Sequence, residues 1–162
     1  MIRSLLLVLL FSCSSPKHWI GDKQLGKKNI PLFLKKYAQG LEDADFYEKW
    51  KENGNNFYEV KNKNVSISVS KTGTLIEREE DISEDKIPPH IIETIKSYIH
   101  ENYPESKVTE MEHRVTPLGR FYDVEIRHPS SPSGYWELTF TENQGAFVGK
   151  EIEDYETPMT LN

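Results

Sequence analysis

The feature that most constrains this chain is the segment from Ile82 to Pro104, which carries the start, the apolar stripe and the end of one helix. Pro88 and Pro89 suit the first turn of a helix, where backbone N–H groups have no intrahelical partner in any case. Isoleucine and tyrosine then recur at steps of three and four, which gives one apolar face. Tyr103 followed by Pro104 ends the pattern. A helix with one apolar face needs a surface to cover, and alternating segments on both sides of it predict a sheet.

Period-two alternation predicts antiparallel strands before and after this helix. Val65 to Ser70 alternates branched apolar residues with serine, as in a strand with one buried face. Asn53-Gly54 is a strong hairpin signal. A second, shorter helix is predicted from Asn29 to Gly40. The expected strands are 46–51, 57–60, 65–70, 74–80, 108–115, 121–127, 136–141 and 146–152.

The two halves of the chain match in element order and in several residues. Phe57-Tyr58-Glu59-Val60 corresponds to Phe121-Tyr122-Asp123-Val124, and the turn glycines Gly73 and Gly145 correspond as well. We therefore predict an α+β fold built from two tandem repeats, each a helix with a four-stranded antiparallel sheet, over about 29–81 and 82–153. Independent convergence of the two halves on a common pattern is the alternative.

The N-terminus has the features of a secretion signal. Arg3 precedes an apolar run from Leu5 to Phe11, which is too short to span a bilayer. Leu10 to Cys13 resembles a bacterial lipobox. We predict a lipoprotein signal peptide over 1–12, a lipidated Cys13 with a flexible tether to residue 28, and a polar tail over 154–162. An ordinary or uncleaved signal with an idle thiol is the alternative. Lipidation would place the protein in the bacterial cell envelope, facing the periplasm or the exterior.

The sequence resembles the PepSY-like, beta-lactamase-inhibitor-like (BLIP-like) domains of exported bacterial lipoproteins. The matching residues are Thr72-Gly73-Thr74-Leu75, Ile82, Ile87-Pro88, Ile91, Ile95, Tyr98, Tyr103-Pro104, Phe121-Tyr122-Asp123-Val124-Glu125 and Trp136-Glu137-Leu138-Thr139-Phe140. The first repeat lacks the Tyr-Pro end of the helix. The resemblance implies a helix packed on a curved antiparallel sheet, and a role in binding or restraining another protein. It implies no catalytic residues.

Charge and motif content argue against several other functions. A formal net charge of −6, with dispersed basic residues, disfavours binding to nucleic acid phosphates. His100-Glu101 begins like a zinc-protease motif, but Pro104 stands where the second histidine is needed. The segment from Asp81 imitates the opening of a calcium loop, but Lys86 stands where such a loop requires glycine. We expect no catalytic residue, no metal site and no cofactor.

Period two also divides the residues of the sheet between its two faces. Tyr122, Val124 and Ile126 suit the core, so their neighbours along the strand should point outward. Aromatic rings among charges suit a protein-binding surface. The alternative is that these rings cover cross-strand neighbours or the other repeat. The candidate binding residues are Phe57, Glu59, Phe121, Asp123, Glu125, Arg127, Tyr135 and Glu137.

The leading hypothesis is a lipid-anchored, non-catalytic module that binds another exported protein, as an inhibitor or regulator of an enzyme such as a peptidase. Two alternatives belong to other classes. One is a structural lipoprotein of an outer-membrane assembly complex. The other is a carrier of a small apolar ligand or a hydrolase using carboxylates. A closed apolar cavity, or a pair of carboxylates with raised pKa values in a cleft, would favour this alternative.

Overall fold

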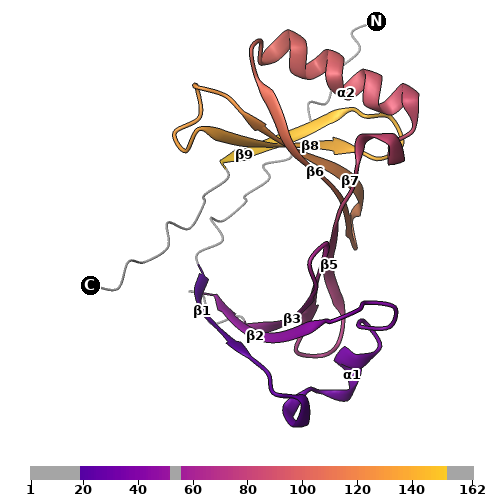
Figure 1. Ribbon diagram of the computed structural model, residues 1–162, viewed down its shortest axis with the longest axis vertical. Helices are drawn as coiled ribbons and strands as arrows, with labels where there is room; N and C mark the ends of the chain where they lie inside the picture. The colour runs from indigo at the N-terminus through magenta and orange to yellow at the C-terminus, as the bar shows by residue number, and fades with distance from the viewer. Residues whose placement is uncertain (1–18, 52–55, 153–162) are drawn as a thin grey trace, which may run out of the picture.

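The computed structural model describes residues 19–51 and 56–152, and within them nine strands form one antiparallel sheet (Figure 1). Each strand pairs with the next one along the chain, so the sheet is a continuous meander. The strands are β1 Trp19–Gln24, β2 Asp45–Lys51, β3 Asn56–Lys61, β4 Val65–Ser70, β5 Leu75–Asp81, β6 Lys107–Thr116, β7 Gly119–Arg127, β8 Tyr135–Thr141 and β9 Phe147–Ile152. The helices are α1 Leu32–Lys35 and α2 Pro89–Asn102, with short 3-10 turns η1 Lys27–Asn29 and η2 Glu84–Lys86.

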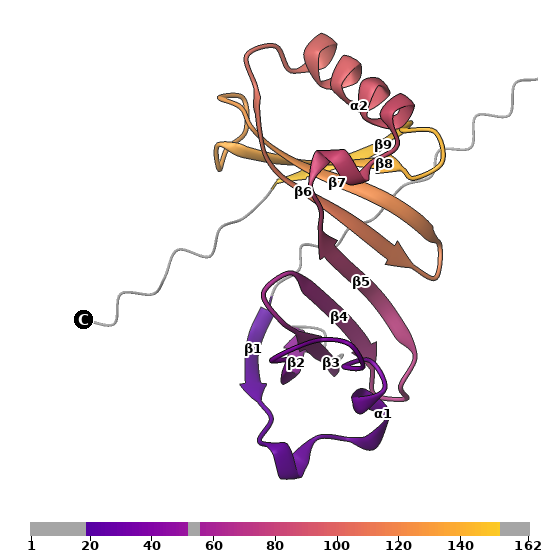
Figure 2. The same ribbon diagram turned by 45° about the vertical axis from the view of Figure 1, so that its right-hand side comes forward.

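The sheet is bent, and both helices lie on its outer side (Figures 1 and 2). α2 covers β6 to β9 at one end, and α1 packs on β3 and β4 at the other. β5 joins the two halves, and it pairs with β6 only over Arg78 to Asp81. We call the face of the sheet opposite the helices the inner face. The α+β class predicted from the sequence is confirmed, and the two halves share one sheet.

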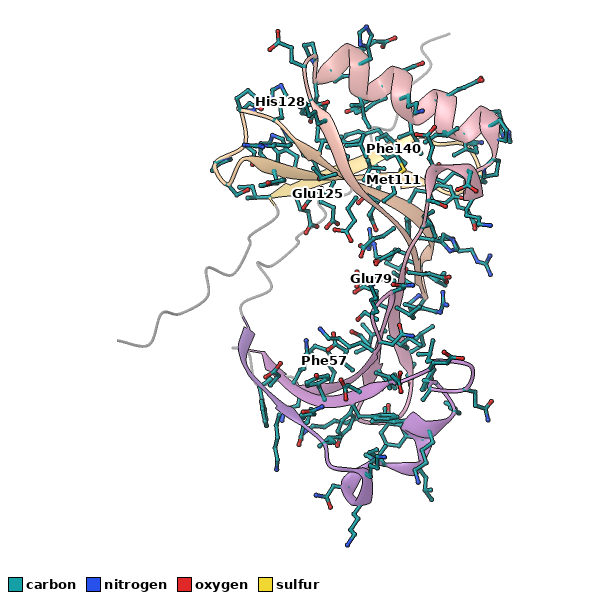
Figure 3. The ribbon with its side chains drawn as sticks, in the orientation of Figure 1. Phe57, Glu79, Met111, Glu125, His128 and Phe140 are labelled. Carbon is teal, nitrogen blue, oxygen red and sulfur yellow. The ribbon has the colours of Figure 1, made fainter. Side chains whose placement is uncertain are left out.

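α2 forms where the sequence predicts it and supplies one side of the larger core. Ile91, Ile92, Ile95 and Ile99 are buried, as their spacing requires. They pack on apolar residues of β6, β7 and β8. The helix ends at Tyr103, whose backbone N–H donates to the carbonyl of Ile99 over 2.8 Å. The buried residues facing α2 are Met111, Tyr122, Val124, Ile126, Leu138 and Phe140, of which Figure 3 labels Met111 and Phe140.

The first helix is much shorter than predicted. Leu32–Lys35 is helical, and the residues up to Gly40 continue as turns. A four-residue helix gains little from its own hydrogen bonds, because nucleation fixes several residues for the first bond. Packing holds this segment instead, since Leu34 is fully buried in a second core with Val60, Ile67 and Val69.

The segment predicted as a flexible tether contains a strand, so that prediction was wrong for Trp19–Gln24. β1 pairs antiparallel with β2, with Asp22 opposite Lys49 and Gln24 opposite Tyr47. An edge strand can be held by backbone hydrogen bonds without an alternating apolar pattern, so pattern reading misses it.

Several predicted features lie outside the described residues. They are the signal peptide with Cys13, the Asn53-Gly54 turn and the tail over 154–162. The strands flanking that turn do pair antiparallel, with Trp50 opposite Asn56.

Each turn glycine singled out in the sequence lies against the helix of its own half. Gly73 has φ +82°, and its carbonyl accepts a 2.9 Å hydrogen bond from the Tyr37 hydroxyl. Gly145 has φ +63°, and a Cβ there would lie 3.1 Å from the carbonyl oxygen of Ile91. Only glycine adopts such a backbone without strain and allows so close an approach. Both turns therefore pack tightly on the helices.

Replacing Ile95 by alanine should lower the free energy of unfolding by about 2–5 kcal/mol, because it leaves a cavity under α2. Urea titration followed by circular dichroism measures the change. Leu118→Ala is the control, since Leu118 is 93% exposed and should shift stability by no more than about 0.5 kcal/mol. Equal effects of the two variants would contradict the assigned core.

Gly145→Ala should destabilise the protein by at least about 1–2 kcal/mol, because alanine at positive φ is strained and its Cβ would meet α2. Thermal unfolding of the purified variant gives the comparison. Gly26→Ala is the matched control, since a Cβ at Gly26 meets nothing within 4 Å. A Gly145→Ala protein as stable as the parent would show that the turn can relax away from the helix.

Candidate functional site

All the candidate binding residues lie on the inner face of the sheet. On β7 and β8, Phe121 is opposite Thr141 and Asp123 is opposite Thr139, while Tyr122 and Val124 are buried in the core beneath α2. Directly opposed residues share a face, so the register places the rest of the β7–β8 set with them. Phe57 and Glu59 lie on β3, on the same face of the other half, because Tyr58 and Val60 pack toward α1.

Half of these residues are less accessible than the sequence suggested. The exposed fractions are 5% for Phe57, 7% for Glu59, 3% for Asp123 and 8% for Glu125. Bending crowds the side chains on the inner face, and Lys49 Nζ lies 2.9 Å from Glu59 Oε2. The Ser66 hydroxyl also donates to Glu59. For Phe57, the alternative that the ring covers its neighbours is therefore favoured.

The other half of the set remains accessible to different degrees. Arg127 is exposed, whereas Phe121, Tyr135 and Glu137 are partly exposed. Phe121 lies under the guanidinium of Arg114, with 5.2 Å from that group to the ring centre. These side chains come from β6, β7 and β8, so the accessible candidates gather on the half of the sheet that α2 covers from outside.

Strand register aligns carboxylates across the inner face in two adjoining rows, which we call the acidic rows. One row runs Glu110, Glu125, Glu137 and Glu151 on β6, β7, β8 and β9, each residue directly opposite the next. The other runs Asp81, Glu112, Asp123 and Thr139 on β5 to β8. Like charges directly opposite one another destabilise a sheet. Hydrogen bonds from Arg114 to Asp123 and from Thr109 to Glu125 offset part of this repulsion.

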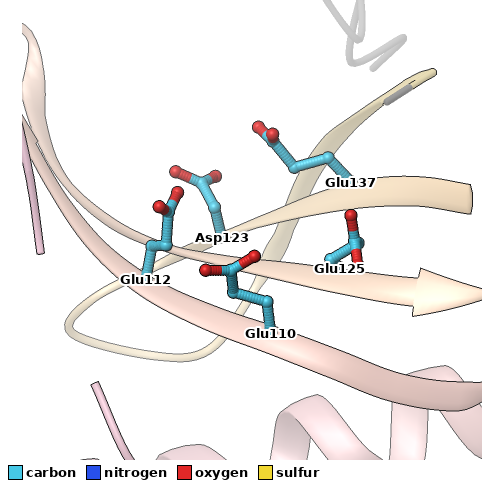
Figure 4. A pocket seen from close by; sticks show the side chains of 5 residues that line it. All are labelled: Glu110, Glu112, Asp123, Glu125 and Glu137. Carbon is cyan, nitrogen blue, oxygen red and sulfur yellow. The ribbon is translucent and has the colours of Figure 1, made fainter. Parts of the chain in front are cut away.

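Five of these carboxylates surround a hollow of about 70 Å³ (Figure 4). They point to the side of the sheet away from the helix. One carboxylate oxygen from each of Asp81, Glu110 and Glu112 lies within 4.8 Å of the other two. Oxygen ligands of this type suit hard cations. The lining residues are Glu110, Glu112, Asp123, Glu125 and Glu137.

Arg114 neutralises one end of the acidic rows. Its guanidinium donates to both carboxylate oxygens of Asp123 and, over 3.3 Å, to the hydroxyl of Thr139. Glu77 lies 3.7 Å from it on the adjoining strand. Burial alone would lower the pKa of Arg114, but the hydrogen bond and charge of Asp123 outweigh burial and raise that pKa. Asp123 is therefore a structural carboxylate, fully bonded although buried.

Among the described residues, none compensates the charge of Glu112 as Arg114 compensates that of Asp123. Burial raises the pKa of its carboxyl to about 8, and the negative charges of Glu79, Glu110, Asp123 and Asp81 add to the effect. Near neutral pH this side chain therefore holds a proton for a substantial part of the time.

The sequence analysis included Asp123, Glu125 and Glu137 but missed Asp81, Glu110 and Glu112. The alternation of Glu110, Glu112 and Arg114 along the strand was a usable signal that all three share one face. Their alignment with the carboxylates of the next strand depends on strand register, which pattern alone does not give.

Glu112→Gln should stabilise the protein increasingly as pH rises. The folded pKa of about 8 lies above the unfolded value, so parent stability is full below the unfolded pKa and falls as pH rises toward and through 8. Urea unfolding at pH 5, 7 and 9 tests this. Glu93→Gln on the exposed side of α2 is the control. A constant stability difference across this range would show that Glu112 is not the titrating group.

Solved structures from Bacteroides species have a fold similar to that of this chain. A DUF2874 family protein from Bacteroides uniformis superposes with a TM-score of 0.56 at 12% identity, over 75% of this chain and 88% of that one. A candidate periplasmic protein from Bacteroides eggerthii superposes with a TM-score of 0.57 at 11% identity, over 77% of this chain and 88% of that one. A BLIP-like protein from Bacteroides fragilis superposes with a TM-score of 0.47 at 10% identity, over 86% of this chain and 80% of that one. This superposition is too loose to carry an argument.

No protein-family model matches the chain, and neither does any curated protein. Identities this low establish a shared α+β fold and nothing about activity. Membership of the PepSY-like family and the lipid anchor stay predictions. The chain has the fold of the Bacteroides uniformis and Bacteroides eggerthii proteins.

Proposed function

We propose that this chain is a non-catalytic module of the bacterial cell envelope that binds another exported protein through the inner face of its sheet. The observation that carries the proposal is the division of roles between the two faces. The outer face carries the two hydrophobic cores, which α2 and the α1 segment cover. Within the described ranges, no helix covers the inner face, which presents charge and partly exposed rings instead.

The accessible inner-face residues are of the kinds that anchor protein interfaces. Phe121 and Tyr135 provide aromatic area, while Arg127 and Glu137 provide charge beside them. Aromatic residues and arginine are enriched where binding energy concentrates. Phe57 and Glu59 contribute to stability rather than contact in this proposal, since both are buried.

The envelope location rests on the N-terminal sequence. The apolar run before Cys13 and the lipobox-like residues support export and lipidation. The periplasmic description of the Bacteroides eggerthii protein is consistent with this location. Among the helices of residues 19–51 and 56–152, none has the length and hydropathy to cross a membrane.

A tandem origin from PepSY-like repeats is part of the same proposal. Gly73 and Gly145 occupy corresponding turns, and each lies against the helix segment of its own half, near Phe33 and Ile91 respectively. Such a correspondence is simply explained by duplication of one helix-plus-sheet unit.

A hydrolase that uses carboxylates is the second candidate function. The raised pKa of Glu112 beside other carboxylates favours it, because a proton donor next to an ionised acid is the usual acid–base pair. The hollow of about 70 Å³ argues against it, since sites for small ligands are commonly several hundred Å³. The structural-lipoprotein alternative shares the anchor but needs no accessible inner face.

A photo-crosslinking amino acid placed at Tyr135, in the full-length protein expressed in its own envelope, should give one discrete adduct. The same group at Glu101, exposed on α2, should give none because it lies on the outer side. Phe121→Glu, which changes the ring beside Arg114, should reduce the Tyr135 adduct at least about fivefold while leaving the melting temperature nearly unchanged. Equal adducts at both positions, or none at either, would contradict binding through the inner face.

A further inference from the structure

We infer that the ladder between β5 and β6 is a proton-controlled joint between the two halves of the sheet, which is closed while Glu112 is protonated and opens more readily once Glu112 is ionised. The joint consists of Arg78 to Asp81 on β5 and Glu112 to Val115 on β6. Opening means that the hydrogen bonds between these two strands break while each half stays folded. The inference is independent of the binding function, because it concerns the sheet itself.

The joint has few interactions that resist opening. β5 and β6 pair over four residue pairs, fewer than any other neighbouring strands of the described sheet, whereas β6 and β7 pair over nine. Within the described residues, one hydrophobic cluster reaches Leu75 and the other begins at Ile82, so neither includes the β5 side of the joint. Local opening costs least where few buried contacts and few hydrogen bonds oppose it.

Strand register brings two carboxyl groups together in the joint. The N–H of Ile82 donates to the carbonyl of Met111 over 2.9 Å, and hydrogen-bonded pairs alternate with non-hydrogen-bonded pairs in an antiparallel ladder. Asp81 and Glu112 are therefore a non-hydrogen-bonded pair, the kind in which opposed side chains lie closer together. The N–H of Asp81 agrees with this register, because it donates to the carbonyl of Asn64 on the other side of the strand.

The remaining pairs of the joint do not place like charges opposite each other. On the inner face Glu79 is opposite Arg114, and on the outer face Glu80 is opposite His113. Opposite charges across a pair stabilise a sheet, and like charges destabilise it. Ionisation of Glu112 therefore creates the one like-charge pair among the four.

Charged groups face Glu112 from its own strand and from both sides. The cation on its strand is Arg114, two residues along, whose guanidinium donates to both carboxylate oxygens of Asp123 and lies 3.7 Å from Glu77. The facing carboxylates are Asp81 and Glu79 on β5, Glu110 on β6, Asp123 and Glu125 on β7, and Glu137 on β8.

Several of these carboxylates are held by other groups. Thr109 donates to Glu125, and Glu79, Glu110 and Glu137 each make a further interaction. The inference therefore uses the titration of Glu112 alone. Burial raises the pKa of this carboxyl to about 8, with the neighbouring negative charges adding to the effect.

The sign of the pH dependence follows from the two states of the joint. Opening exposes Glu112 to water and separates it from Asp81, so its pKa falls toward the ordinary range for a glutamate. A group whose pKa is higher in the closed state favours closure fully below its open-state pKa, and this contribution is lost as pH rises through the closed-state value of about 8. The joint should therefore open more often as pH rises from 6 to 9.

The backbone amides of β6 report on both of its ladders from a single strand. By the alternation above, the N–H groups of His113 and Val115 point to β5, whereas those of Glu112 and Arg114 point to β7. Amide hydrogen exchange of the purified full-length protein, followed by NMR and corrected for the intrinsic rate at each pH, measures the protection of each ladder separately. EDTA is present throughout, so that the proton is the only ligand that varies.

In the parent protein, protection at His113 and Val115 should fall at least about tenfold between pH 6 and pH 9, while protection at Glu112 and Arg114 should change by less than about threefold. Glu112→Gln should hold the protection at His113 and Val115 within about twofold over this range, because glutamine does not ionise. Asp81→Asn should lessen the fall, since it removes the charge opposite Glu112 and leaves the titrating carboxyl in place.

Glu93→Gln is the matched control, because it removes the same charge from the exposed side of α2 and should keep the pH dependence of the parent. The inference is overturned if Glu112→Gln shows the same pH dependence as the parent, or if the parent shows none. Equal loss of protection on both sides of β6 also overturns it, since the opening would then involve the whole half and not the joint.

Discussion

The fold depends on the burial of one isoleucine face of α2 against β6, β7 and β8. Side chains alternate along a strand, so committing Val124, Ile126 and Leu138 to the core also commits their neighbours to the opposite face. Most of the apolar residues of these strands are used beneath the helix. The inner face therefore receives the charged residues, and its character follows from the packing on the outer side.

The carboxylates of the inner face have two different environments. Asp123 is buried and held by Arg114 and Thr139, so it connects three neighbouring strands and stabilises them. Thr109 makes a similar bond to Glu125. Glu112, by contrast, is surrounded by charges of its own sign. Carboxylates of the first kind explain why the sheet tolerates an acidic face, and the raised pKa of Glu112 reduces the negative charge that this face carries near neutral pH.

Sequence patterns predicted the second half of the molecule well, because α2 and its strands alternate strongly and are bounded by clear turn residues. They failed where packing or backbone pairing replaces periodicity. The predicted helix after Asn29 is mostly turns anchored by Leu34, and β1 is held at the edge without an apolar pattern. The correct face was assigned to Phe57, but its burial was not, because bending of the sheet is a property of the whole fold. The acidic rows were missed because they are created by register between strands.

The connection between the halves has a mechanical consequence. β5 and β6 pair over four residue pairs, whereas β6 and β7 pair over nine. Each half has its own hydrophobic cluster, and the larger one draws only on residues from Ile82 onward. Elastic deformation of a sheet concentrates where the fewest hydrogen bonds resist it. Force applied to one half therefore reaches the other through the short ladder between β5 and β6, and not through a hydrophobic cluster shared by the described residues.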